Sequence, residues 1–185
     1  MPTDRRTVLA DAAIDVLAGA GMRGLTHRAV DRAAHMPAGT TSAYYRTRHA
    51  LLTALVSRLV ALDQEELQAI GERTPVPRDA EELVAQIAAF AEQRLTGDAR
   101  RRSLARYACV IESVHQSELR EILTPRQNAG RQVVHDFLAA QGVADAEERT
   151  VTLLTCVDGL IFDRLVGGGV VSEQEIRGLV LAALR

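Results

Sequence analysis

The chain has 185 residues, of which 47% are hydrophobic and only 3% aromatic, which suits one domain of ordinary size or a small module joined to a larger one. Ala and Leu supply much of the apolar content, and both favour helices, which argues against a β-sheet protein. The net charge is −2 and all 22 basic residues are Arg, so catalysis through a lysine amine is excluded.

Charge is distributed unevenly along the chain. Residues 1–50 hold seven Arg and four Asp, a net charge of +3, whereas the remaining residues hold fifteen Arg and twenty acidic residues, a net charge of −5. This asymmetry indicates an N-terminal module that faces phosphate groups and an acidic body.

The cysteines and the apolar segments restrict the class of protein further. Cys109 and Cys156 lie far apart in apolar helical stretches, so we expect buried free thiols rather than a disulfide or a metal site. The N-terminus lacks the apolar core of a signal peptide, and no apolar run approaches the roughly 18 residues of a membrane span. We expect a cytoplasmic protein with no membrane association, metal or cofactor.

In chain order, the first predicted helix begins near residues 3–4, where a polar side chain can cap it, and Gly21 stops it. Thr26 caps a short second helix. Pro37 then opens a third helix over about residues 38–45. Two short helices separated by a tight turn, after a longer supporting helix, form a helix-turn-helix arrangement.

Beyond this motif the pattern stays helical. Thr47 caps a long fourth helix that runs to about Ile70, and a linker of residues 71–77 follows it. Further helices are predicted near residues 79–95, 98–114, 117–140, 145–166 and 172–184. The expected fold is all-α with about nine helices, comprising a three-helix domain with the helix-turn-helix over residues 1–46 and a helical domain over 47–185.

The stretch from Gly24 to Leu52 resembles the DNA-binding domain of the TetR (tetracycline-repressor-like) family. Its most recognisable part reads Pro37-Ala-Gly-Thr-Thr-Ser-Ala-Tyr-Tyr-Arg-Thr-Arg-His-Ala-Leu-Leu52. The family typically shows a Gly-Thr, an aromatic pair, a basic residue and then Ala-Leu-Leu. The resemblance covers about residues 5–55 and is only architectural beyond them. It implies a non-enzymatic regulator, usually a repressor, that binds a palindromic DNA operator as a homodimer and is released by a small-molecule effector. On this resemblance, residues 1–46 form the DNA-binding domain and residues 47–185 the effector-binding and dimerisation domain.

The predicted DNA contacts lie around the third helix. A recognition helix must present small or polar side chains to the base edges, and a helix N-terminus with a free hydroxyl suits phosphate oxygens. By analogy with the family, Tyr44 is assigned to DNA and Tyr45 to the core. The expected contacts are Thr26, Arg28, Pro37, Ala38, Gly39, Thr40, Thr41, Ser42, Tyr44 and Arg48.

Two positions depart from the family pattern. His35 stands where glycine is usual, and a side chain there costs energy if the backbone needs a positive φ. Asp31 stands where many members carry a small residue against the recognition helix, so we expect it to point outward or to pair with Arg28. Either departure could alter how the third helix sits.

The segment from Val151 to Val166 is apolar on more than one side, so it needs cover from two directions. We expect its own domain to pack on one side and a second chain to pack on the other. The alternative is a monomer in which this helix is central and buried. A two-fold dimer would read two half-sites about one DNA turn apart. The expected interface residues are Leu153, Leu154, Val157, Leu160, Ile161, Leu165, Leu179 and Val180.

The helices over residues 79–140 are where TetR-like proteins usually enclose an effector. The expected ligand contacts are Phe90, Leu104, Tyr107, Val110, Ile111 and His115, each of which could instead be core. A di-iron enzyme would need the Glu-x-x-His pair twice, and Glu112-Ser-Val-His115 occurs once. The remaining alternative is a helical small-molecule carrier or scaffold that does not bind DNA.

Overall fold

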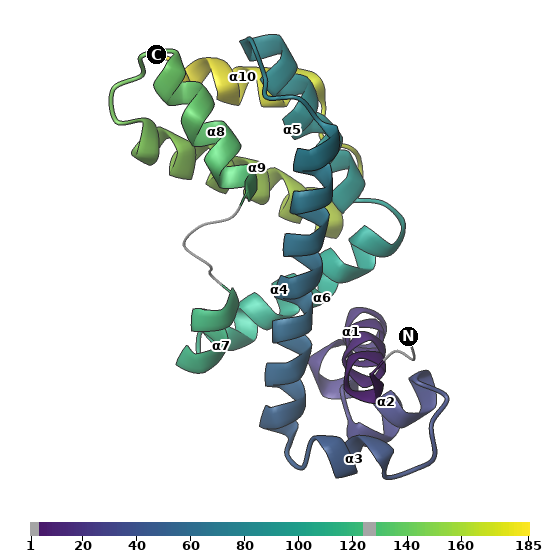
Figure 1. The fold of residues 1–185 in the computed structure, drawn as a ribbon. Coiled ribbons are helices and arrows are strands. Elements are labelled where there is room, and N and C mark those ends of the chain that lie inside the picture. Colours follow the sequence, from purple (N-terminus) through teal and green to yellow (C-terminus); the bar gives the residue numbers. More distant parts are fainter. Residues whose placement is uncertain (1–3, 124–128) are drawn as a thin grey trace. The chain divides into compact units, whose positions relative to one another are not determined.

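The computed structural model describes residues 4–123 and 129–185, which form ten α-helices and no strand within those ranges (Figure 1). The helices are α1 Arg5–Gly24, α2 His27–Ala33, α3 Thr40–Tyr44, α4 Arg48–Arg73, α5 Ala80–Arg94, α6 Gly97–Ser113, α7 Ser117–Leu123, α8 Ala129–Ala140, α9 Ala146–Gly167 and α10 Glu173–Ala183. The described residues fall into two compact units, residues 4–63 with 101–123 and residues 64–100 with 129–185. None of the described helices is long and apolar enough to cross a membrane.

Short polar side chains fix where the helices begin. Each accepts a hydrogen bond from a backbone N–H of the first turn, which would otherwise have no partner. The caps are Asp4 for α1, Thr26 for α2, Thr47 for α4, Asp79 for α5 and Ser172 for α10. Of the two residues predicted as possible caps of the first helix, Asp4 is the cap, and the predicted caps Thr26 and Thr47 are confirmed. Gly21, with φ 66°, ends the regular part of α1 as predicted.

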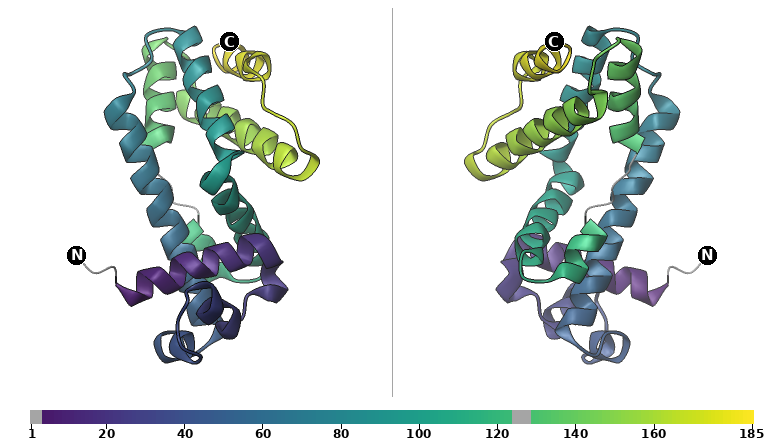
Figure 2. Two further views of the ribbon diagram at one scale, coloured as in Figure 1. Left: turned by 90° about the vertical axis from the view of Figure 1, so that its right-hand side faces the viewer. Right: turned by 90° about the vertical axis from the view of Figure 1, so that its left-hand side faces the viewer.

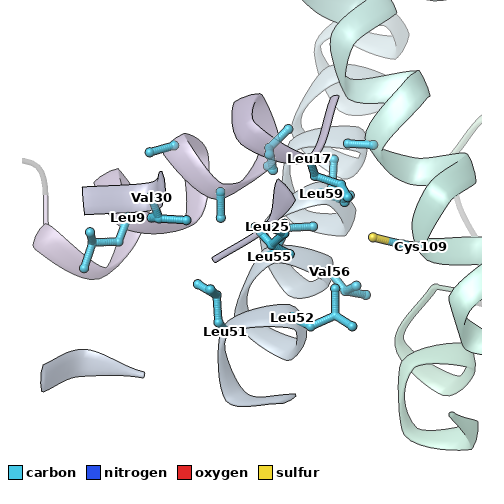
Figure 3. Close-up of a cluster of buried hydrophobic side chains, with 14 of the residues drawn as sticks. Leu9, Leu17, Leu25, Val30, Leu51, Leu52, Leu55, Val56, Leu59 and Cys109 are labelled. Atoms are coloured by element: carbon cyan, nitrogen blue, oxygen red, sulfur yellow. The ribbon is translucent and has the colours of Figure 1, made fainter. Parts of the chain in front are cut away.

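The first unit has its own apolar core, built from α1, α2, α4, the C-terminal half of α6 and α7 (Figure 3). Leucines from α1 and α4 meet at its centre, and Leu17, Leu55 and Leu59 are each at most 2% exposed. Burying such a side chain contributes about 1.5–3 kcal/mol. Cys109 lies in this core, and its burial raises the pKa of the thiol to about 12.

The second unit packs α5 against α10 and α9 against both α8 and α10 (Figure 2). The buried faces of α9 and α10 consist mainly of branched aliphatic residues, and Leu153 and Val180 are at most 2% exposed. Ion pairs connect the same helices at the surface, including Arg164 of α9 with Glu175 of α10 at 2.6 Å.

Three expectations about the elements need correction. Residues 117–140 hold two helices rather than one, and the five residues between them, which include Pro125, lie outside the described ranges. A proline removes a helix N–H donor. The helix α3 begins at Thr40 rather than near residue 38, because Gly39 has a left-handed φ of 91°. Cys109 is buried as expected, but Cys156 is exposed.

Candidate nucleic-acid interface

The turn between α2 and α3 contains two residues in the left-handed region of backbone space. His35, at the position where glycine was expected, has φ 53°, and Gly39 has φ 91°. Glycine adopts such values without strain, whereas a residue with a Cβ does so at a cost. The turn therefore requires a positive φ at position 35, and His35 adopts it although its side chain makes this conformation costly.

Asp31, on α2, is buried at 3% exposure and points toward α3, not outward and not toward Arg28. Its Oδ2 accepts the N–H of Gly39 at 2.8 Å, and its Oδ1 accepts the N–H of Thr41 at 2.7 Å and the Thr41 hydroxyl at 2.6 Å. Burial of this carboxylate opposes its ionisation, but the hydrogen bonds from Thr41 and Gly39 outweigh that effect and hold the pKa of Asp31 below its ordinary value. The prediction for Asp31 was wrong because its donors come from the following helix.

His27, one helical turn before Asp31, contacts the other end of α3. Its Nε2 lies 2.7 Å from the carbonyl oxygen of Tyr45, the residue that ends α3. Because a carbonyl oxygen only accepts, Nε2 must carry the proton in this contact. No role was predicted for His27, although its i, i+4 spacing from Asp31 places both residues on one face of α2.

The side chains of α3 divide sharply between inside and outside. Ser42 and Ala43 are exposed, and Thr40 is half-buried with its hydroxyl donating to the carbonyl of Pro37 at 2.7 Å. Thr41 is 0% exposed. Thr41 therefore faces α2 and is unavailable to DNA, which corrects its predicted role, while Pro37, Ala38 and Gly39 lie exposed before the helix.

Of the aromatic pair, Tyr45 lies in the core, as the resemblance to the family implied. Tyr45 is 7% exposed in the core, and its hydroxyl donates to the carbonyl of Arg6 at 3.1 Å. Burial raises the pKa of Tyr45 above its ordinary value. Tyr44 is half-buried, and the Arg6 guanidinium lies 5.6 Å from its ring centre and 5.8 Å from that of Tyr45. These contacts connect the start of α1 to the end of α3.

Three of the predicted DNA contacts, Thr26, Arg28 and Arg48, lie outside α3 and differ in what their side chains contact. Thr26 and Arg28 are exposed at the beginning of α2, where Thr26 accepts the N–H of Ala29 at 3.2 Å. Arg48 is also exposed, but its guanidinium donates to the carbonyl oxygens of Met22 and Leu25. Arg48 thus connects the start of α4 to the segment that follows the bend in α1.

The predicted ligand contacts do not belong to one unit. Five of them lie on or just after α6 within the first unit, where Leu104 and Tyr107 are half-buried and the others are exposed: Val110 at 40%, Ile111 at 65%, and His115. Phe90 lies on α5 in the second unit, half-buried, with the Arg94 guanidinium 4.9 Å from its ring centre. Arg94 itself is 7% exposed and lies 3.6 Å from Glu66.

Most of the predicted dimer stripe faces the interior of its own unit. Five of its residues are at most 6% exposed and so cannot form a contact surface: Leu153, Val157, Ile161, Leu165 and Val180. Leu154, Leu160 and Leu179 are half-buried. The apolar residues left exposed are instead Val151 at 40%, Phe162 at 42% and Val166 at 73% on α9, and Leu181 at 45% on α10.

Known proteins share this architecture. A family model for the tetracyclin repressor-like C-terminal domain matches residues 78–185, more than half of the chain. The structure of a TetR-family member from Streptomyces coelicolor A3 aligns at 23% identity and TM-score 0.73, covering 98% of this chain and 99% of the other. A transcriptional regulator from Rhodococcus sp. Rha1 aligns at 21% identity and TM-score 0.72, covering 98% and 94%.

The multidrug binding protein EbrR, in its complex with ethidium, aligns at 24% identity and TM-score 0.72, covering 98% of this chain and 99% of the other. The chain has no match among the curated proteins compared with it. Within the described residues, no group of three or more His, Cys, Asp or Glu side chains could hold a metal ion. The family match over more than half of the chain, together with the full-length agreement in fold, shows that the protein belongs to the tetracycline-repressor-like family of transcriptional regulators, which are not enzymes.

Proposed function

We propose that the protein is a ligand-responsive repressor that binds a palindromic operator as a homodimer and leaves it when a small molecule binds. The observation that carries this proposal is the division of α3, which presents Ser42 and Ala43 outward and turns Thr41 inward. Small outward side chains let a helix approach the base edges of a major groove closely. The positive charge of residues 1–50 favours the same partner.

Within this proposal, the DNA contacts divide into two kinds. Ser42 and Thr40, with the exposed backbone from Pro37 to Gly39, lie where base edges would be read. Thr26 and Arg28 lie at the start of α2, where phosphate oxygens would meet backbone N–H groups and a guanidinium. Tyr44 contributes a phosphate contact through its hydroxyl. Phosphate contacts position the protein, and base contacts give it sequence preference.

The proposed dimer surface is the exposed apolar face of α9 with Leu181 of α10. Val151, Phe162 and Val166 lie within about 60° of one another around α9, because successive helix residues turn by about 100°. Each of them is at least 40% exposed, and an exposed apolar face of this kind marks a protein–protein contact. Gly159 lies near the same face and would let a second helix approach closely.

The proposal of a small-molecule effector rests on a structural relative and on the exposed apolar residues of α6. EbrR, the structural relative described above, binds ethidium, so we propose a small organic molecule as the effector of this protein too. The exposed apolar residues of α6, Val110 and Ile111, are candidate contacts, as are Leu104, Tyr107 and His115 of the same region. An effector acts by binding one conformation more tightly than the other and so shifting their populations.

The test is binding of the purified protein to the intergenic DNA upstream of its own gene. We expect sequence-specific retention that weakens steeply with salt, because phosphate contacts release counterions. A screen of small organic molecules, with ethidium as the first probe, should then identify compounds that release the DNA. If no fragment of that region is retained even at low salt, the regulator proposal fails and a small-molecule carrier becomes the better interpretation.

A further inference from the structure

The reading helix α3 is too short to hold its own position. It has five residues, little more than one turn, and an isolated helix of that length is unstable in water. Apolar packing supports only its C-terminal end, where Tyr44 packs against the core and the adjoining Tyr45 packs in it, whereas Thr41, the one fully buried residue of α3, has a polar side chain. Something other than its own hydrogen bonds must therefore fix its direction.

The structure offers α2 as that support, at both ends of α3. At the N-terminal end, the buried Asp31 carboxylate accepts two backbone N–H groups and the Thr41 hydroxyl. At the C-terminal end, His27 donates to the carbonyl of Tyr45. A carboxylate beside the N–H end of a helix and a donor beside its C=O end both match the helix dipole. We name these two residues, His27 and Asp31, the α2 clamp.

We propose that the α2 clamp sets the position of α3 and is therefore what gives operator binding its sequence specificity. The inference rests on the proposed DNA-binding function and adds two positioning residues to it. Neither residue needs to touch DNA: Asp31 is 3% exposed and acts through Thr41 and Gly39. Loss of the clamp should leave the phosphate contacts of Thr26 and Arg28 in place while the base-reading surface shifts.

Asp31→Asn separates this proposal from simple electrostatics. Removing a negative charge from a DNA-binding region should by itself strengthen binding to any duplex. Loss of the clamp should weaken binding to the operator alone, because the amide keeps one acceptor oxygen and cannot accept at both Gly39 and Thr41. The matched control is Asp15→Asn on α1, which makes the same charge change at a side chain that is 62% exposed.

The experiment measures affinity for the operator and for a scrambled duplex at one salt concentration. We expect Asp31→Asn and His27→Ala each to lose at least about tenfold in operator affinity, since specific binding commonly exceeds non-specific binding by about 10³ or more. Affinity for the scrambled duplex should change by less than about twofold. Operator affinity of Asp31→Asn equal to or above that of Asp15→Asn would overturn the proposal.

A double variant guards against loss of folding. Asp31→Ala with Thr41→Val removes the carboxylate and the hydroxyl together, so that only the backbone N–H groups of residues 39 and 41 lose their acceptor, which costs less than Asp31→Ala alone. We expect this variant to stay folded by circular dichroism and yet to bind operator and scrambled duplex alike. Recovery of wild-type operator affinity would show that apolar packing is enough to position α3, and the clamp proposal would be wrong.

Hydrogen exchange tests the clamp without DNA, so that its failure and that of the DNA-binding proposal can be told apart. In Asp31→Asn at least one of the amides of Gly39 and Thr41 should exchange faster than in the wild type, because only one can keep its acceptor, while the amide of the core residue Leu55 should not change. Unchanged exchange at both positions would refute the clamp whatever the DNA result. Faster exchange in a protein that binds no DNA would support the positioning of α3 and refute only its reading role.

Discussion

Arg48 offers the sharpest distinction between a structural and a DNA-contacting role. Its guanidinium donates to the carbonyl oxygens of Met22 and Leu25, beyond the bend at Gly21. Carbonyl groups at a helix end lack helical partners, so Arg48→Ala should leave both without this donor. Hydrogen bonds to charged groups contribute about 1.5–3 kcal/mol each when buried. Because Arg48 is exposed, we expect a total loss of about 1–2 kcal/mol.

The assay is urea unfolding of the wild type, Arg48→Ala and Arg48→Met, the last of which keeps the apolar stem. A loss of about 1–2 kcal/mol corresponds to a fall of about 2–8 °C in the melting temperature of a chain of this length. Arg46→Ala is the matched control, since it removes the same charge from an exposed neighbouring position. It should change the unfolding free energy by less than about 0.5 kcal/mol.

A measurement of DNA binding provides the outcome that would refute a structural role for Arg48. A guanidinium on a phosphate contributes about one unit to the slope of log affinity against log salt. If Arg48→Ala left the unfolding free energy unchanged and reduced that slope by about one, the guanidinium would lie on DNA, and the interpretation of its carbonyl contacts would be refuted.

Three further predictions concern the dimer, the core and pH. Phe162→Glu, at an exposed site on α9, should give a folded monomer in analytical ultracentrifugation, and a dimer unchanged in stability would exclude this face. Leu55→Ala, at 0% exposure, should lower the unfolding free energy by about 2–5 kcal/mol, and a loss under about 1 kcal/mol would contradict the assigned core. Because the pKa of Asp31 is depressed in the folded protein, its stabilisation is present above the ordinary carboxyl pKa of about 4 and is lost as pH falls through the folded value. Unfolding free energy should therefore decline more steeply below about pH 4 in the wild type than in Asp31→Asn, and parallel curves would contradict this.

The order of the helices was predictable because its signals are local. Asp4, Thr26 and Thr47 cap helices where the sequence placed them, and a short side chain needs only the next three residues to act as a cap. The helix-turn-helix motif was predictable for the same reason, since its turn and its aromatic pair lie close together in sequence. Prediction from local signals was less successful over residues 117–140. Apolar periodicity on both sides of Pro125 predicted one helix there, whereas the structure has α7 and α8.

The facing of α3 could not be predicted from its composition. Thr40, Thr41 and Ser42 are alike in size and polarity, and only the position of a distant acceptor decides which of them turns inward. That acceptor is Asp31, ten residues before Thr41. An acidic residue at a position where many family members carry a small one was the available signal, and pairing it with a donor on the next helix would have found the contact.

The outward-facing side of α9 could not be predicted from the sequence for a related reason. The helix α9 is apolar over much of its circumference, so periodicity identifies two covered sides but not which one its own domain covers. The structure assigns Leu153 and Ile161 to the interior and leaves Phe162 outside. That choice depends on where α8 and α10 pack, which is information carried by residues distant in sequence.

The contact between Asp31 and Thr41 also limits the order in which the two positions can change during evolution. If Thr41 first becomes Val, the carboxylate still accepts the N–H groups of Gly39 and Thr41's replacement, and the intermediate protein keeps two of its three donors. If Asp31 first becomes Ala, a buried hydroxyl and a buried N–H lose their acceptor together, at a cost of about 1–3 kcal/mol for each group. A lineage that exchanges this polar pair for an apolar one should therefore lose the hydroxyl before the carboxylate.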